Sequence, residues 1–188
     1  MIYWLYVLQM AWYIHCTFFH VFVDIRKYDF WPMVVHHLAT IGLLYASFSV
    51  GHFRIGLLTL YCMDVCDVFL HFGKLIRFVD NVYHNRLCDL CITLCFFGLV
   101  TTWVYYRLIL FPVKVLYVSS VVLVHYLGYA NADNAAFFNV LLFVVYILQI
   151  YWFYLIAAYA IKVVCHGKQL DDERDPSIPE PEAVDKND

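Results

Sequence analysis

The sequence predicts an all-α protein, a polytopic bundle of transmembrane helices. The chain has 188 residues, of which 64% are hydrophobic and only 14% are charged, well outside the usual range of soluble proteins. Its apolar residues fall in long runs, and a bilayer span needs about 20 such residues in succession. The composition gives no indication of nucleic-acid binding, because basic residues do not outnumber acidic ones.

The apolar runs divide the chain into six segments joined by short polar connections. The first has no basic region before it and is too long to be the core of a cleavable signal, so we predict that it stays in the protein as a helix. The fifth follows Pro112, which favours a helix boundary. The six segments are 2–23, 33–50, 55–75, 87–106, 113–129 and 137–164.

Basic residues between the segments predict their orientation, because Lys and Arg concentrate on the cytosolic side of a membrane. This rule requires the stretch 87–136 to cross an odd number of times, so one of its two segments does not cross. Residues 113–129 are the shortest segment, and we predict a re-entrant or interfacial piece there. The bundle then has five spans plus this piece, with six spans as the alternative. The basic residues that set this orientation are Arg26, Lys27, Lys74, Arg77, Arg86, Lys162 and Lys168.

Polar side chains recur at helical spacing within four of the segments. At about 100° per residue each set falls on one face of its helix. A charged side chain at the bilayer centre costs roughly 2.5–3.5 kcal/mol, so we expect these faces to meet around an enclosed polar chamber. The sets are Gln9, Tyr13, Cys16 and His20; His36, Thr40 and Ser47, with His37 beside them; Asp64, Asp67, His71 and Lys74; and Asn139, Tyr146 and Gln149.

The adjacent histidines, His36 and His37, are the strongest functional signal. Imidazole titrates near neutrality and needs a polar partner away from water. We therefore expect the pair to face Asp64 and Asp67 across the chamber. These four side chains are also ligand types for zinc or iron, but histidines spaced i, i+4 on one helix are missing, and we predict no metal.

The cysteines lie almost wholly in apolar segments, where cysteine behaves as a small hydrophobe. Cys88, Cys91 and Cys95 resemble metal ligands in their spacing, but no fourth ligand lies beside them. We interpret them, together with Cys62 and Cys66, as packing residues, and expect all seven cysteines to be reduced.

The chain changes character near its end. Residues 171–188 contain eight acidic and two basic residues. We therefore expect two parts, a membrane domain over 1–166 and an acidic, disordered cytosolic tail over 167–188.

Two stretches carry a resemblance to a known family. "RKYDFWPMVVHHLAT" and "FRIGLLTLYCMDVCDVFLHFGKL" are similar to the Lag motif of the ceramide synthases, within the TLC domain. The resemblance extends through "YWLYVLQMAWYIHCTFF", "YYRLILFPVKVL", "FFNVLLFVVYILQIYWFYLI" and the acidic "DDERD", and covers roughly residues 1–175.

The resemblance implies a multi-pass enzyme of the endoplasmic reticulum membrane with a cytosolic C-terminal tail. Such an enzyme transfers a fatty acyl group from acyl-CoA to the amine of a sphingoid base, releasing CoA and ceramide. Acyl-CoA is then a substrate, and no further cofactor is implied. Membrane lipids surround the protein, and pairing with itself or with related synthases is a further expectation. The essential histidines of the family map onto His36 and His37, and its aspartates onto Asp64 and Asp67.

This chemistry suits the four residues. Only a neutral amine attacks a thioester, and imidazole is a base of the right strength. Either one histidine takes the proton of the amine, or one attacks the thioester and forms a transient acyl-imidazole. Asp64 or Asp67 would hold an imidazole in one tautomer.

Two weaker sites follow from position. The resemblance implies that the connection 129–136, which contains Asn131 and Asp133, influences acyl-chain length. Basic residues at the predicted cytosolic mouth would meet the phosphates of CoA. They are Arg26, Lys27, Lys74 and Arg77.

The sequence departs from the family pattern at two positions. Met63 stands where the family usually has histidine, and His71 where it usually has glutamate. The chain also begins inside the shared domain, so we expect it to be incomplete at the N-terminus. Three alternatives stay open: a non-catalytic relative in lipid sensing or membrane-protein insertion, an inactive fragment of a synthase, and a transporter-like protein with a proton relay.

Overall fold

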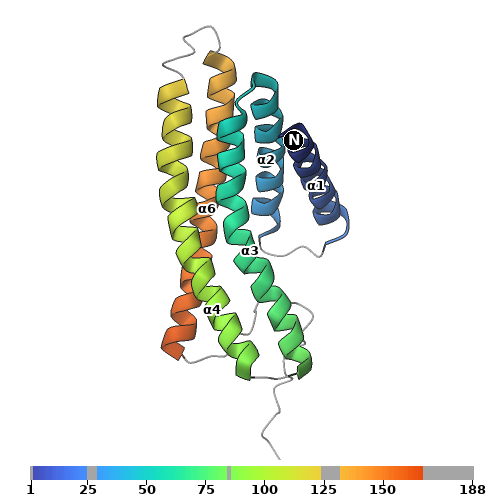
Figure 1. The fold of residues 1–188 in the computed structure, drawn as a ribbon, viewed down its shortest axis with the longest axis vertical. Coiled ribbons are helices and arrows are strands. Elements are labelled where there is room, and N and C mark those ends of the chain that lie inside the picture. Colours follow the sequence, from blue (N-terminus) through green and yellow to red (C-terminus); the bar gives the residue numbers. More distant parts are fainter. Residues whose placement is uncertain (1, 25–28, 84–85, 124–131, 167–188) are drawn as a thin grey trace, which may run out of the picture.

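The computed structural model describes residues 2–24, 29–83, 86–123 and 132–166, and every element in these ranges is helical. Figure 1 shows them as one bundle. The elements are α1 (Ile2–Phe22), α2 (Phe30–Val50), α3 (Phe53–Tyr83), α4 (Arg86–Thr102), the π-helices η1 (Trp103–Leu116) and η2 (Val118–Leu123), and α6 (Ala132–His166).

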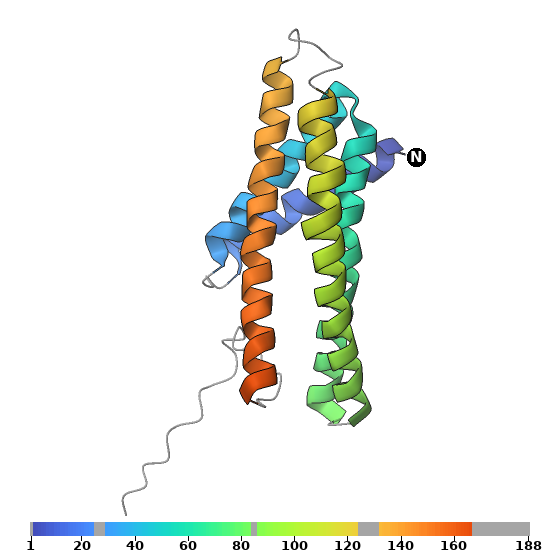
Figure 2. The same ribbon diagram turned by 90° about the vertical axis from the view of Figure 1, so that its left-hand side faces the viewer.

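Three long rods form the body of the bundle: α3, the run of α4, η1 and η2, and α6. Figure 2 shows α6 and the α4–η2 rod extending side by side, with α1 and α2 inclined to them. Within the described residues, three stretches are long and apolar enough to cross a membrane, namely Phe53–Asp80, Arg86–Val121 and Ala136–Ile161. The protein is an all-α, multi-pass membrane protein, as the sequence predicts.

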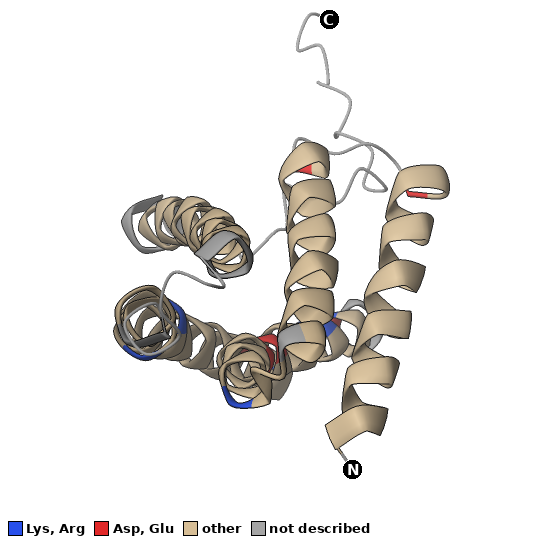
Figure 3. Cartoon of the chain, turned by 90° about the horizontal axis from the view of Figure 1, so that it is seen from above, with Lys and Arg blue, Asp and Glu red and all other residues tan. Residues whose placement is uncertain are grey.

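The outer surface of the bundle matches this environment. Large apolar side chains such as Trp12, Phe78 and Leu94 are more than 60% exposed, and Figure 3 shows few charged residues along the helices. Exposed apolar surface of this extent is typical of a protein that faces lipid.

One prediction about the segments is wrong. No break separates 87–106 from 113–129, because the helix runs on from Arg86 to Val121. Pro112 lies inside η1, where the Tyr117 N–H donates to the Pro112 carbonyl, an i→i−5 bond. A proline ring clashes with the preceding turn of an α-helix, and the wider π-helical turn accommodates it.

The π-helix also keeps one row of side chains in line. Five residues at intervals of four are all buried. In an α-helix of 3.6 residues per turn such a row drifts by about 40° at each step, and the wider turn reduces this drift. Within this row Arg107 contacts α3 and α6, and Ser119 contacts α6. The row consists of Trp103, Arg107, Phe111, Val115 and Ser119.

The helices that flank the connections are longer than predicted. α3 continues to Tyr83 and α4 begins at Arg86, so most of the predicted connection 77–86 is helical. The last helix begins at Ala132, five residues before the predicted start. By contrast, the turn between α2 and α3 is short, as predicted. Gly51 has φ 80° there, and the His52 N–H donates to the Ser47 carbonyl at 2.9 Å, a glycine C-cap.

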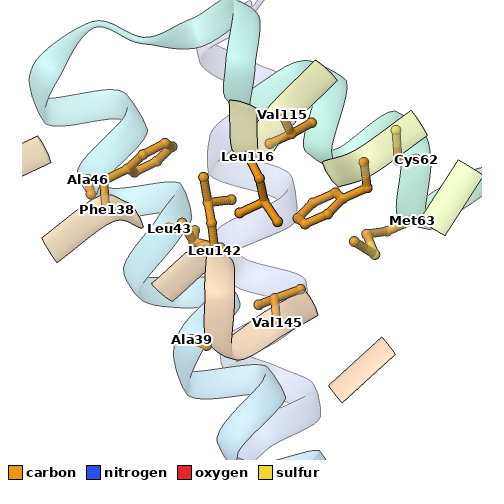
Figure 4. Packing of buried hydrophobic residues seen from close by; sticks show 11 residues of the cluster. Ala39, Leu43, Ala46, Cys62, Met63, Val115, Leu116, Phe138, Leu142 and Val145 are labelled. Carbon is orange, nitrogen blue, oxygen red and sulfur yellow. The ribbon is translucent and has the colours of Figure 1, made fainter. Parts of the chain in front are cut away.

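The main core lies between α2, α3, α6 and η1. Figure 4 shows Phe138 and Leu142 of α6 directed toward Leu43 of α2 and Leu116 of η1. Cys62 is fully buried in the same cluster, which confirms its interpretation as a packing residue. This core fixes the separation of the helices that carry the polar side chains.

The helix α1 is held against the α2–α3 turn by a small polar junction. The Tyr6 hydroxyl lies 2.9 Å from Ser47 Oγ, and Ser47 Oγ donates to the His52 carbonyl at 3.0 Å. Gly56 of α3 lies against this junction, and a Cβ atom there would overlap both Tyr6 Oη and Ser47 Oγ.

We expect Gly56→Ala to destabilise the protein by about 1–3 kcal/mol, the usual cost of overpacking. The matched control is Gly73→Ala, whose Cβ would make an ordinary contact of 3.5 Å with Cys95 Cβ. Thermal unfolding of both variants in detergent measures the difference. Equal midpoints for the two would contradict the close approach at Gly56.

Candidate active site

Two turns into α2, His36 and His37 lie side by side with part of each ring closed off from the surface. His37 is only 8% exposed. The Nδ1 atoms of both rings are buried and have no hydrogen-bond partner among the described residues. Each imidazole therefore has a nitrogen that the protein framework does not use, as a base or a nucleophile requires.

Rings from two other helices enclose the pair. The Tyr13 ring of α1 lies 6.3 Å from the ring of His36 and 6.1 Å from that of His37, centroid to centroid. Trp152 of α6 meets His36 edge-on at 5.2 Å, and His20 of α1 meets His37 at 5.9 Å. Such a wall of rings limits the access of water, which strengthens electrostatic interactions inside.

The two aspartates of α3 lie in different environments. The Asp67 carboxylate accepts a hydrogen bond from Arg107 Nη2 at 2.6 Å and forms an ion pair with it. Asp64, one turn earlier, is exposed. No hydrogen bond joins either carboxylate to His36 or His37 in the part of the chain that the structure describes. We predicted that the histidine pair faces both aspartates across a chamber, and Asp67 instead pairs with Arg107 of η1.

Arg107 is the centre of a buried polar network. Only 5% of it is exposed, and its Nη2 also donates to the Met63 carbonyl at 2.7 Å. Its Nη1 donates to Gln149 Oε1 at 3.1 Å, and its guanidinium carbon lies 4.0 Å from the centre of the Trp103 ring. One buried charge thus ties η1 to α3 and α6, with Asp67 as its counter-ion.

The network reaches the histidine pair through α6. Gln149 and Trp152 are three residues apart, so they lie on the same face of that helix. Gln149 bonds Arg107, while Trp152 contacts His36. The structure therefore connects the predicted histidines with Asp67 indirectly, through α6 and Arg107.

Met63 borders this network. The residue is 5% exposed, and its sulfur accepts a hydrogen bond from Gln149 Nε2 at 3.1 Å. Met63, the residue that departs from the family pattern, therefore lies beside the ion pair of Asp67 and Arg107. It is four residues before Asp67, so both lie on the same side of α3.

The weaker predicted residues lie away from the histidines or outside the described part of the chain. Lys74 is exposed on α3, two turns beyond Asp67, and Arg77 follows it. Asp133 belongs to the first turn of α6, although a loop was predicted there. Outside the described residues lie Arg26, Lys27 and Asn131.

Sequence reasoning missed Arg107 and Trp152. The signal for Arg107 was present, because it is the one charged residue between Asp89 and Lys114, and a charge inside a membrane segment marks function by default. Trp152 gave no signal, since a tryptophan in an apolar helix is most often a packing residue. As for metals, no three ligand-type side chains converge in the ranges the structure describes.

Comparison with known proteins identifies the family. The TLC domain matches residues 1–158 of the chain. Ceramide synthase LOH2 of Arabidopsis thaliana is 30% identical over 92% of this chain and 57% of its own length. Ceramide synthase 4 of Mus musculus is 32% identical over 98% of this chain and 44% of its own length.

A third relative extends the comparison to nematodes. Ceramide synthase hyl-2 of Caenorhabditis elegans is 29% identical over 92% of this chain and 52% of its own length. The chain thus spans about half the length of the curated relatives it matches. No solved structure matches it. Because the domain match covers most of the sequence and these three relatives are named ceramide synthases, the chain belongs to the TLC-domain family, on its ceramide synthase side.

Proposed function

We propose that this protein is a sphingosine N-acyltransferase, which transfers a fatty acyl group from acyl-CoA to the amine of a sphingoid base. One observation carries the proposal: two adjacent imidazoles, His36 and His37, each keep a buried Nδ1 atom without a protein partner. They do so inside a wall of aromatic rings, in a chain whose relatives are named ceramide synthases.

The reaction forms one bond and breaks one bond. The amine nitrogen attacks the thioester carbonyl, a C–N bond forms, and the C–S bond to CoA breaks. A sphingoid amine enters in its protonated, ammonium form. The conversion of ammonium and thioester into amide and CoA thiol therefore releases one net proton. A base near neutrality must take it, and the free nitrogen of His36 or His37 suits that task.

The neighbouring residues have separate roles in this scheme. Consecutive residues of a helix point about 100° apart, so one histidine can accept the acyl group or activate the amine while the other moves the proton. The ion pair of Asp67 and Arg107 holds α3 and η1 in register behind them. Acyl-CoA is the substrate, and the scheme uses no further cofactor.

The surroundings of the site agree with two lipid substrates and one soluble product. Acyl chain and sphingoid base enter from the membrane, while CoA stays in the cytosol. We place the CoA side near Lys74 and Arg77, and we propose an endoplasmic reticulum location with a cytosolic C-terminal tail. Pairing with itself or a related synthase stays a prediction.

A non-catalytic TLC-domain protein in lipid sensing or membrane-protein insertion is the second candidate. One observation favours it: Asp67 pairs with Arg107 and leaves both imidazoles without a carboxylate partner. A triad-type arrangement uses such a partner to orient the histidine.

An assay of membranes separates the two candidates. The complete gene product is expressed in cells without endogenous ceramide synthases, and microsomes receive a sphingoid base with a panel of acyl-CoAs. We expect N-acylated product by mass spectrometry for at least one acyl-CoA. Product no greater than in membranes without the protein would favour the non-catalytic candidate.

Met63→His tests the departure from the family pattern. A histidine at 63 would replace a weak sulfur acceptor with an imidazole nitrogen that accepts a stronger hydrogen bond from Gln149. We expect kcat to rise modestly, about two- to fivefold, from a measurable baseline. Met63→Leu, which keeps the volume, is the control. If Met63→His turns on activity that the native protein lacks, the native protein is the non-catalytic relative.

The connection 129–136 is proposed to tune acyl-chain length. Replacement with the corresponding segment of a relative of different preference should shift the distribution of ceramide products. The measurement is the product spectrum with an equimolar mixture of acyl-CoAs. An unchanged spectrum at normal total activity would place chain selection elsewhere.

A further inference from the structure

His20 closes the end of α1 onto the start of α2 with two hydrogen bonds. Its Nδ1 lies 3.1 Å from Asp24 Oδ2, four residues on. Its Nε2 lies 3.3 Å from the backbone carbonyl oxygen of Phe30, the first residue of α2. The side chain is held on both edges of its ring.

The two partners of His20 determine its protons. A carbonyl oxygen only accepts hydrogen bonds, and so does an ionised carboxylate. The Asp24 side chain is 46% exposed and is the carboxylate partner of this contact. Both contacts at once therefore need a hydrogen on each ring nitrogen, which is the imidazolium form of His20.

Two further features favour a cation at this position. His20 lies in the last turn of α1, where the free carbonyl groups of a helix carry a partial negative charge. Its ring also stacks on the face of Phe30, with centroids 5.0 Å apart and planes 25° from parallel. The electron-rich face of an aromatic ring attracts a cation.

This cation faces the histidine pair. Phe30 and His37 are seven residues apart, so they lie on nearly the same side of α2, and the His20 ring meets the His37 ring edge-on at 5.9 Å. Like charges at such a distance repel. The charge of His20 thus opposes a second charge on His37. The other titratable or charged groups around His20 and His37 are Tyr13, His36, Asp64, Asp67 and Arg107.

We propose that His20 is a positioning residue for the acyl transfer: as an imidazolium fixed by Asp24 and the Phe30 carbonyl, it orients the His37 ring and keeps it neutral. The role of His20 in acyl transfer rests on the proposed function, whereas the charge of His20 depends only on the fold. A neutral His37 has the lone pair that a base or nucleophile needs.

Nitrogen-15 NMR of the histidine side chains measures the charge directly. The complete gene product is labelled with ¹⁵N-histidine and reconstituted in nanodiscs at neutral pH. We expect the NMR signal of one ring with two protonated nitrogens. This signal should be absent in His20→Gln, and in Asp24→Asn the same ring should be neutral. A neutral His20 in the native protein would overturn the proposal, whether or not the protein acylates anything.

Activity variants then separate charge from packing. His20→Gln keeps one hydrogen bond and loses the charge, whereas His20→Lys keeps a cation beside Asp24. We expect a loss of about tenfold in kcat for Gln, with KM nearly unchanged, and at least half of the native kcat for Lys. His15→Gln is the matched control, because His15 is exposed on the same helix and contacts only its own helix's rings among the described residues.

Equal losses in His20→Gln and His20→Lys would show that packing alone matters, and would overturn the role of the charge. A failure of the proposed function is distinguishable, since His36→Ala would then leave the measured acylation unchanged while the NMR result stands.

Discussion

His36→Ala and His37→Ala should each lower the rate of N-acylation by at least about 10²-fold, the usual range for loss of a positioned base. The loss is larger for the histidine that carries the acyl group, if the acyl-imidazole route operates. Both side chains lie among rings rather than in the apolar core, so the bundle has little reason to unfold.

The control for these variants is the amount of inserted protein, measured by membrane extraction and immunoblotting at matched expression. His71→Ala is a matched substitution, since His71 is exposed on α3 and takes no part in the network. We expect it to keep near-native activity. Native turnover in either His36→Ala or His37→Ala would remove that residue from the mechanism.

Arg107→Met should lower the stability of the bundle, because it breaks the buried polar network that joins η1 to α3 and α6. Arg107 is buried and bonds Asp67, Met63 and Gln149. Removal of one partner of a fully buried ion pair costs roughly 3–5 kcal/mol. The Asp67 side chain is 38% exposed, and water there screens the remaining charge, so we expect about 2–3 kcal/mol.

Thermal unfolding in detergent measures this loss, and Lys114→Met is its control. Lys114 lies on the same π-helix but is exposed, so the same change of charge should cost little. Adding Asp67→Asn to Arg107→Met should recover part of the stability, because no unpaired carboxylate then remains. A midpoint for Arg107→Met as high as that for Lys114→Met would contradict the central place of Arg107.

Much of the architecture could be predicted because lipid leaves few choices. Apolar runs of about 20 residues must be helical in a bilayer, and this gave the helices on either side of the Gly51 turn. The predicted helix boundary at Pro112 was wrong, because the rule that proline ends a helix assumes an α-helix. A π-helical turn removes the clash of the proline ring, and no feature of the local sequence indicated such a turn.

The sequence could predict which candidate residues share a helix face, but not which faces meet. Helical periodicity places Asp64 and Asp67 on one polar face, and the histidine pair was evident from its apolar surroundings. Which face meets which depends on the packing of side chains between three helices. Asp67, which was expected to face the histidines, pairs with Arg107 of η1 instead, because the buried guanidinium needs a counter-ion.

The most direct test of the account is the stoichiometry of acyl transfer by the purified complete gene product in nanodiscs. Sphingoid base and acyl-CoA are added together, and free CoA thiol and N-acylated product are measured in the same samples. Over many turnovers we expect the two to appear in equal amounts, both to need the amine beyond one CoA per protein molecule, and His36→Ala to reduce both to background. Equal product from the native protein and His36→Ala, or none from either, would contradict it.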